Sequence, residues 1–123
     1  MEALRVVVDG TPLPVELTDE CPETRAAIER ALPIEGEATR WGEELYVGTG
    51  VDVPAENARA EVERGSLAYW PRGNVVCLFW GPTPASTGDE PRATSPVNVF
   101  GRADVSEFRP DAGGATLRIE TVE

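Results

Sequence analysis

The sequence contains no histidine and no lysine, and it has only two cysteines among 123 residues. Without an imidazole, the chain cannot form a Ser-His-Asp or Cys-His catalytic arrangement, and it has no histidine to hold a metal. Two cysteines distant in sequence do not make a zinc site. These absences argue against the familiar kinds of hydrolytic chemistry, and we expect neither a bound metal nor a cofactor.

The two cysteines predict different environments. Cys77 lies in the apolar run NVVCLFW and is expected to be a small buried hydrophobic residue. Cys21 precedes Pro22, which suits the first helical position, so Cys21 is a candidate helix N-cap. A helix N-terminus can lower a thiol pKa, which makes a reactive Cys21 conceivable, although no histidine is present as its base. We expect both thiols to be reduced.

Long hydrophobic runs are also missing. No apolar stretch approaches the ~20 residues that span a bilayer, and the segment MEALRVVVDG lacks the basic region and the long apolar core of a signal peptide. We therefore expect a soluble, cytoplasmic protein that does not bind a membrane. The length predicts a single domain over residues 1–123.

Positive charge is scarce: 11 basic residues, all arginine, stand against 22 Asp and Glu, for a net charge of −11. This charge would repel phosphates, so we expect no nucleic-acid partner. An acidic, lysine-free surface is typical of proteins that work in molar salt, where the Debye length is ~3 Å. We hypothesise a halophilic source. The alternative is a GC-rich genome that encodes arginine in place of lysine, with the acidity serving only solubility.

Short β-rich runs separated by turn residues dominate the chain. One helix is predicted from Pro22 to Leu32, because a proline begins it and Pro33 ends it. The longest loop is predicted at 81–96 and a turn at 109–114. Strands are predicted at 4–10, 12–17, 34–41, 44–48, about 51–53, 67–70, 75–80, 95–106 and 115–122. Eight or nine strands with one helix predict a mainly β fold that closes, or nearly closes, into a barrel.

The aromatic residues are the best indication of a binding site. Neighbouring strand residues point to opposite faces, so Tyr69 and Trp70, and likewise Phe79 and Trp80, cannot all enter a barrel. Some must lie on the outer face, where the helix, a loop or a ligand would have to cover them. We therefore expect a binding groove there.

Two adjacent acids lie near these aromatic residues. Glu43 and Glu44 point to opposite faces if they belong to a strand, so they cannot form one paired carboxylate site. One of them, flanked by Trp41 and Tyr46, could line a pocket. The alternative is that both are solvated surface acids.

The order of motifs along the chain resembles a known family. The motifs are V-V-V-D-G, P-E-T-R-A-A-I-E-R-A-L-P, W-G-E-E-L-Y-V, G-S-L-A-Y-W-P, C-L-F-W-G-P-T-P-A-S and V-N-V-F-G-R. Over nearly the whole chain they resemble a group of small prokaryotic cyclophilin-like proteins, an atypical branch of the cyclophilin fold. The resemblance implies a mainly β, closed, eight-stranded antiparallel barrel with one main helix at about residues 22–32 and a groove on the barrel exterior.

The resemblance to the peptidyl-prolyl isomerase branch is partial. Leu78 and Phe79 look like the paired phenylalanines of the proline pocket, and V-F-G-R at 99–102 looks like a late strand of those enzymes. The strand that carries their catalytic arginine corresponds to G-E-E-L-Y-V, which offers a glutamate instead, and their pocket histidine corresponds to about Val97. The groups that would hydrogen-bond a twisting prolyl amide are therefore replaced.

Two functions remain open. The first is a weak or diverged peptidyl-prolyl cis-trans isomerase that acts on a proline-containing peptide, with Arg40, Arg72 or Arg102 as the donor that a barrier of ~18–20 kcal/mol requires. The second is a non-catalytic module that binds a peptide or a small ligand in the same groove. The candidate ligand-binding residues are Trp41, Glu44, Tyr46, Tyr69, Trp70, Phe79, Pro82, Thr83 and Ser86.

The halophilic hypothesis predicts a salt-dependent stability. Molar KCl screens the repulsion among the acids that dilute buffer leaves unscreened. We expect the midpoint of thermal unfolding to rise by at least about 4 °C between dilute buffer and molar KCl, which for a domain of this size corresponds to roughly 1 kcal/mol. Circular dichroism melts measure this shift, and an unchanged midpoint contradicts the hypothesis.

Overall fold

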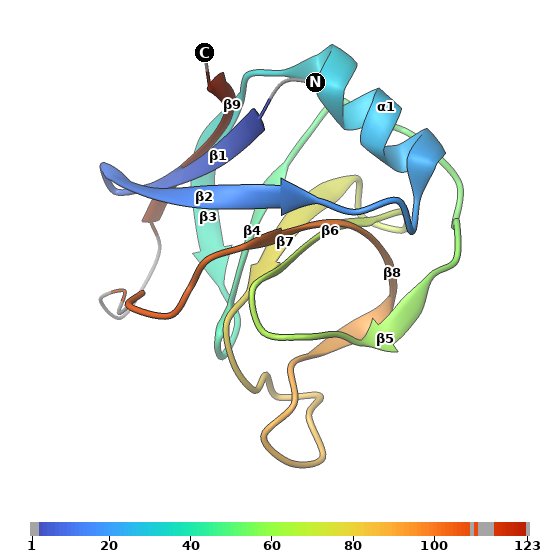
Figure 1. The fold of residues 1–123 in the computed structure, drawn as a ribbon. Coiled ribbons are helices and arrows are strands. Elements are labelled where there is room, and N and C mark those ends of the chain that lie inside the picture. Colours follow the sequence, from blue (N-terminus) through green and yellow to red (C-terminus); the bar gives the residue numbers. More distant parts are fainter. Residues whose placement is uncertain (1–2, 109, 111–114, 123) are drawn as a thin grey trace.

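The structure, a computed structural model, describes residues 3–108, residue 110 and residues 115–122. Antiparallel strands dominate these residues, and one helix lies against them (Figure 1). None of the helices in the described part of the chain is long and apolar enough to cross a bilayer. In chain order the elements are β1 (Ala3–Val8), β2 (Thr11–Leu17), α1 (Pro22–Ala31), β3 (Ile34–Arg40), β4 (Glu44–Gly48), β5 (Arg59–Glu61), β6 (Ser66–Trp70), β7 (Val75–Phe79), β8 (Arg92–Ala103) and β9 (Ala115–Val122).

Eight of the described strands close into a ring. The strand order β2-β1-β9-β3-β4-β7-β6-β8 returns to its start because β2 also pairs with β8, with Val15 opposite Ala103 and Leu17 opposite Gly101. The pairings around the ring are antiparallel. Closure pairs the edges that an open sheet would expose to other chains. The closed, mainly β, eight-stranded antiparallel barrel is therefore confirmed.

Strand alternation fills the interior of the barrel. Alternate residues of each strand point inward, and β-branched and aliphatic side chains at these positions pack into one cluster. Ala27 and Ile28 of α1 join this cluster, so the helix covers part of the core. Each ring strand contributes at least one buried residue, for example Val6, Leu13, Ile34, Leu45, Leu67, Val76, Phe100 and Leu117.

β8 changes partner along its length. Residues 98–103 pair with β6 and β2 in the ring, whereas residues 92–97 pair with β5. The pairing with β6 shifts register between Leu67 and Ala68, an irregularity of the kind that bends strands. β5 and the first half of β8 thus form a two-stranded ribbon beside the ring (Figure 1). A second apolar cluster lies between the ribbon and the ring and contains Val62, Ala68, Cys77, Phe79, Ala93, Val97 and Val99.

The strand predicted at about 51–53 is not a strand in the structure, and β5 lies further along, at Arg59–Glu61. The Val51 carbonyl oxygen accepts hydrogen bonds from side chains instead, from the Tyr69 hydroxyl at 2.7 Å and from Asn74 Nδ2 at 3.1 Å. Side chains therefore replace the backbone partners that a strand would need here.

The other element boundaries agree with the prediction to within a few residues. The helix ends at Ala31, one residue before the predicted end. The loop predicted at 81–96 is shorter than expected, because the residues from Arg92 onward pair with β5. The turn predicted at 109–114 lies outside the described residues, apart from Pro110.

A carboxylate from a distant loop caps the N-terminus of α1. Glu56 accepts hydrogen bonds from the backbone N–H groups of Glu23 at 3.0 Å and Thr24 at 2.9 Å, and from the Thr24 hydroxyl at 2.7 Å. Partial burial raises the pKa of Glu56, but these hydrogen bonds outweigh it and hold the pKa below its usual value. Asn98 accepts from the Glu56 N–H at 2.9 Å and donates to Thr24 Oγ1 at 3.0 Å. The helix is thereby fastened to β8.

The structure contradicts a reactive thiol at Cys21. The residue is the N-cap of α1, as predicted, but its side chain is fully buried and donates to the Glu56 carbonyl oxygen at 2.9 Å. Burial raises the pKa of the thiol to about 11, and the charges of Glu56 and Glu20 add to this effect. The thiol is therefore protonated at neutral pH, because desolvation outweighs the field of the helix. Both cysteines are free and buried.

Loss of the Glu56 cap should destabilise the fold. We expect Glu56→Gln to lower the free energy of unfolding by roughly 1 kcal/mol at neutral pH, which is typical of a helix cap. Because the folded pKa of Glu56 is depressed, the difference from wild type is present above the unfolded pKa and shrinks as the pH falls through the folded pKa. Urea unfolding at neutral pH and at about pH 3 measures both effects. Glu107→Gln removes the same charge from an exposed position, and an equal loss in that variant would contradict the cap.

Candidate ligand-binding pocket

A pocket of about 260 Å³ lies between the outer face of the ring and the first half of β8. Its walls come from β4, β6, β7 and β8, and from the turn between β3 and β4. We call it the outer pocket. Its lining residues are Trp41, Glu44, Tyr46, Trp70, Val75, Cys77, Ala93, Thr94 and Val97.

Strand alternation brings these side chains to the outer face. In β4, Glu44 and Tyr46 point outward because Leu45, between them, belongs to the interior cluster. The register of β4 and β7 sets Tyr46 opposite Cys77, and Val76 beside Cys77 points inward. The carboxyl, the phenol and the thiol are therefore near neighbours although they come from two strands.

The Trp70 side of the pocket is held in place by two segments. The Trp70 Nε1–H donates to Ser95 Oγ in β8. Gly73, in the turn between β6 and β7, lies against the indole, so that a Cβ on Gly73 would come within 2.5 Å of Trp70 Cε3. Asn74 in the same turn has a φ of 53° and donates to the Tyr69 hydroxyl at 2.8 Å. A side chain at position 73 would therefore displace the indole.

Glu44 is the only charged side chain among the buried residues that the structure describes, and it is 5% exposed. Burial raises the pKa of its carboxyl to about 7, even though a hydrogen bond from the Cys77 thiol favours the ionised form. Burial and the adjacent carboxyl raise the pKa of Cys77 well above its usual value, so the thiol stays protonated. No basic residue is among the lining residues. The pocket thus combines aromatic walls with one carboxyl that titrates near neutral pH.

The structure brings together four of the predicted ligand-binding residues. Tyr69 lies inside the barrel, away from the pocket, and its hydroxyl donates to the Val51 carbonyl oxygen at 2.7 Å. Phe79 faces outward but is fully buried in the cluster between the ribbon and the ring. The four predicted residues that line the pocket are Trp41, Glu44, Tyr46 and Trp70.

Pro82, Thr83 and Ser86 belong to the loop between β7 and β8 and do not line the outer pocket. The Thr83 hydroxyl donates to the Arg92 carbonyl oxygen, and the Ser86 hydroxyl donates to that of Glu90. These bonds hold the loop to itself and to the start of β8. Pro82 borders a different, more polar cavity of about 510 Å³.

The three candidate arginines lie away from the outer pocket. Arg40 pairs with Glu43 at 2.9 Å, and Arg72 is exposed in the turn between β6 and β7. Arg102 pairs with Glu63 at 2.9 Å. The walls of the outer pocket therefore hold no guanidinium that could polarise a bound amide.

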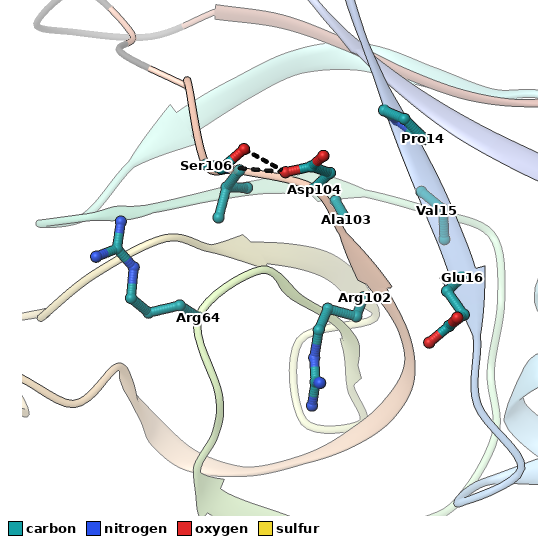
Figure 2. Close-up of a pocket in the computed structure, with 9 residues that line it drawn as sticks. Pro14, Val15, Glu16, Arg64, Arg102, Ala103, Asp104 and Ser106 are labelled. Carbon is teal, nitrogen blue, oxygen red and sulfur yellow. Dashed lines mark hydrogen bonds between the residues drawn. The ribbon is translucent and has the colours of Figure 1, made fainter.

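Arg102 borders a separate, open pocket of about 670 Å³ beside β2 (Figure 2). Figure 2 shows Arg64 and Arg102 spread apart rather than converging on one point. The Asp104 carboxylate in this pocket accepts hydrogen bonds from its neighbour Ser106, from the hydroxyl at 2.7 Å and the N–H at 3.1 Å. Its polar groups are exposed or locally satisfied, so the outer pocket is the better candidate for a ligand site.

Five residues of the outer pocket were outside the predicted ligand-binding set. Val75 and Cys77 alternate with Phe79 on one strand, so the spacing of two could have placed them on its face. Ala93 and Thr94 lie in the predicted loop at 81–96, and Val97 lies just after it, in the strand predicted at 95–106. These residues lie against the sheet because the first half of β8 pairs with β5. No local sequence pattern predicts that pairing.

Comparison with known proteins agrees with the fold. The closed barrel with one helix defines a cyclophilin-type fold, and the model of the family described as Cyclophilin-like matches residues 2–110. The chain belongs to the cyclophilin-like family. The solution structure of the hypothetical protein AF2241 from Archaeoglobus fulgidus is similar, with a TM-score of 0.77 and 39% sequence identity over 98% of this chain and 95% of that chain. No curated protein matches the sequence.

The buried carboxyl should make stability depend on pH. The pKa of Glu44 rises from 4.5 in its usual state to about 7 in the folded protein. Ionisation is therefore costlier in the folded state, and the destabilisation grows as the pH rises from the unfolded pKa to the folded one. We expect Glu44→Gln to match wild type near pH 4 and to exceed its free energy of unfolding by roughly 3 kcal/mol at about pH 8. Urea unfolding across this range measures the difference.

The matched control for this experiment is Glu43→Gln, the same change at the adjacent residue. Glu43 is half-buried outside the outer pocket and pairs with Arg40. Its substitution should not produce a gain that grows between about pH 4 and pH 8. A similar gain in both variants, or a gain in Glu44→Gln that is independent of pH, contradicts the assignment.

Proposed function

We propose that the protein is a binding module that holds a small ligand, or one side chain of a peptide, in the outer pocket. The observation that carries the proposal is a cavity walled by Trp41, Tyr46 and Trp70 around a single buried carboxyl. Ligand sites in proteins are mostly apolar and aromatic, with a few polar groups that orient the ligand. The outer pocket has this composition.

The size of the pocket narrows the class of ligand. Sites for drug-sized ligands occupy ~300–1,000 Å³, and the outer pocket, at about 260 Å³, lies just below that range. The volume suits a fragment-sized molecule or one side chain of a longer partner. An extended peptide would have to place most of its length outside the pocket.

The residues that line the outer pocket argue against efficient prolyl isomerisation. The reaction has a barrier of ~18–20 kcal/mol, and removing one preorganised donor from an active site typically costs about a hundredfold to a thousandfold in rate. Arg40, Arg72 and Arg102 all lie outside the lining of the outer pocket. A charged donor for the twisted amide is therefore missing from its walls.

A weak isomerase is the second candidate, and one observation favours it. With a pKa of about 7, the Glu44 carboxyl is largely protonated in mildly acidic solution. A neutral carboxylic acid in an apolar site can donate a hydrogen bond, and donation to the prolyl nitrogen, whose lone pair becomes localised as the amide twists, would assist the rotation. This mechanism requires the activity to fall as the pH rises through 7.

We also propose that the protein works in concentrated salt. Its net charge of −11 supports this proposal, and so do several arginines that each pair with two acids. Arg59, for example, pairs with Glu20 at 2.6 Å and with Glu63 at 2.8 Å. The 22 acids outnumber the 11 arginines two to one, so a net repulsion among the acids remains, and salt would relieve it.

One NMR experiment tests binding and catalysis together. A proline-containing tetrapeptide and a set of fragment-sized aromatic and aliphatic compounds are added to the ¹⁵N-labelled protein at about pH 6 and pH 8. We expect at least one compound to shift the amide signals of β4, β7 and residues 92–97. We expect cis-trans exchange of the tetrapeptide to keep its uncatalysed time constant of tens to hundreds of seconds.

The outcomes separate the two candidates. Shifts without accelerated exchange support the binding module. Accelerated exchange that weakens from pH 6 to pH 8, and that loses its pH dependence in Glu44→Gln, supports the isomerase, because the glutamine amide can donate at either pH. Failure of all compounds and the tetrapeptide to shift these signals contradicts both.

A further inference from the structure

We propose that the outer pocket is selective for a small organic cation, an ammonium group that carries apolar substituents, as in choline. This inference rests on the proposed function, because it names the class of ligand for the same site. It follows from the charge inside the pocket, the chemistry of its walls and its volume.

Among the described residues, no basic side chain lines the pocket or pairs with the Glu44 carboxylate. Other carboxylates in the described part of the chain whose pKa values are lowered have arginine partners or several hydrogen-bond donors. Arg59 donates to Glu63 at 2.8 and 2.9 Å, Arg102 donates to it at 2.9 Å, and the pKa of Glu63 is held at about 2. Glu44, which is far more buried, receives a hydrogen bond from the Cys77 thiol. A ligand that brings its own positive charge would supply the stabilisation that a buried carboxylate requires.

The walls favour an alkylated ammonium over other cations. The faces of aromatic rings carry partial negative charge and attract cations, with tryptophan the strongest of the natural side chains. Trp41, Tyr46 and Trp70 line the pocket together with Glu44 and supply three such rings. Methyl groups on nitrogen also make apolar contact with Val75 and the other aliphatic lining residues, and they leave no N–H group without a partner.

A metal ion is the competing cation, and the donor set does not fit one. Metal ions of the usual protein kinds take several oxygen, nitrogen or sulfur ligands. Among the described residues there is no group of three or more His, Cys, Asp or Glu side chains that could hold one. A single carboxylate among aromatic rings matches an organic cation instead.

The dimensions agree with a compact ligand. The pocket volume of about 260 Å³ admits a fragment-sized ion and little more. Thr94 is exposed at the pocket, where its hydroxyl can bond a polar group on the ligand's tail. A trimethylammonium head with a short hydroxylated tail has this shape.

The negative charge of the pocket depends on pH through Glu44. The other titratable lining residues are Tyr46 on β4 and Cys77 on β7, and the high pKa of the Cys77 thiol keeps it neutral. The lining residues from β6 and β8 are Trp70, Ala93, Thr94 and Val97, which do not titrate. Affinity for a cation should therefore increase as the pH rises through 7, since the carboxyl ionises over that range.

A pair of isosteric ligands tests the inference. Choline and 3,3-dimethyl-1-butanol have nearly the same shape, but the second has a neutral carbon in place of the charged nitrogen. We measure both by isothermal titration calorimetry and tryptophan fluorescence at about pH 5.5 and pH 8, at one KCl concentration. We expect choline to bind at least about tenfold more tightly than the alcohol at pH 8, with a smaller preference at pH 5.5.

Three variants locate the effect. Glu44→Gln should abolish the preference for choline while leaving the alcohol bound, and Glu43→Gln, outside the pocket, should keep the preference. Trp70→Leu should weaken choline more than the alcohol, because it removes a ring but keeps an apolar wall. A ¹³C NMR titration of the Glu44 carboxyl gives an independent readout: choline should lower its pKa and the alcohol should not, by linkage.

Each contrary result has a distinct meaning. If the alcohol binds as tightly as choline at pH 8, or if Glu44→Gln keeps the preference, the cation inference is overturned while the proposed binding function stands. If neither compound binds but a neutral fragment shifts the pocket signals by NMR, the cation inference again fails alone. If no compound of either set binds, the cation inference and the proposed function fail together.

Discussion

The change of partner within β8 is the constraint on which both the barrel and the outer pocket depend. Its second half pairs with β2 and β6 and so closes the ring, whereas its first half leaves the ring and pairs with β5. One strand therefore completes the core and also builds the wall that stands over the outer face of the sheet. Asn98, at the transition, is fully buried and fastens the helix through Thr24 and Glu56, so the same point also positions α1.

Strand alternation then assigns each aromatic side chain to one of two apolar layers. Tyr69 and Trp80 enter the barrel, whereas Trp70 and Phe79 turn outward toward the ribbon. Phe79 is fully covered, and Trp70, nearer the end of the hairpin, stays partly open. The pocket exists because the ribbon covers most of the outer layer but not all of it.

The electrostatics of the chain set Glu44 apart from its other acids. Along the surface, arginines pair with two acids in several places, and these pairs have little effect on stability because water screens them. Glu44 lies in an apolar layer, where its charge is costly and its pKa is raised to about 7. The chain has many carboxylates, and any of them could be exposed to water. Glu44 is instead buried in a pocket with three aromatic rings, where its ionisation lowers the stability of the fold. We interpret that cost as the consequence of a binding role.

The sequence by itself determined the local features of this protein. Pro22 and Pro33 bound the helix, and alternation separates Tyr69 from Trp70. A spacing of two places Glu44 and Tyr46 on one face, with Trp41 in the adjoining turn. These features follow from backbone geometry over a few residues, which a sequence displays directly. The motif order also indicated the closed barrel of the family.

Only the tertiary structure determined which segments cover the outer face of β4 and which charged side chains lie near it. Residues 92–94 look like loop in the sequence, because the strand that pairs with this end of β8, residues 59–61, lies some thirty positions away and is itself short. The same holds for Arg102, whose acidic partner, Glu63, lies 39 positions away and whose distance from the pocket depends on the packing of the ring. Burial is a property of what packs against a residue, so the raised pKa of Glu44 could not be read from its neighbours in the chain.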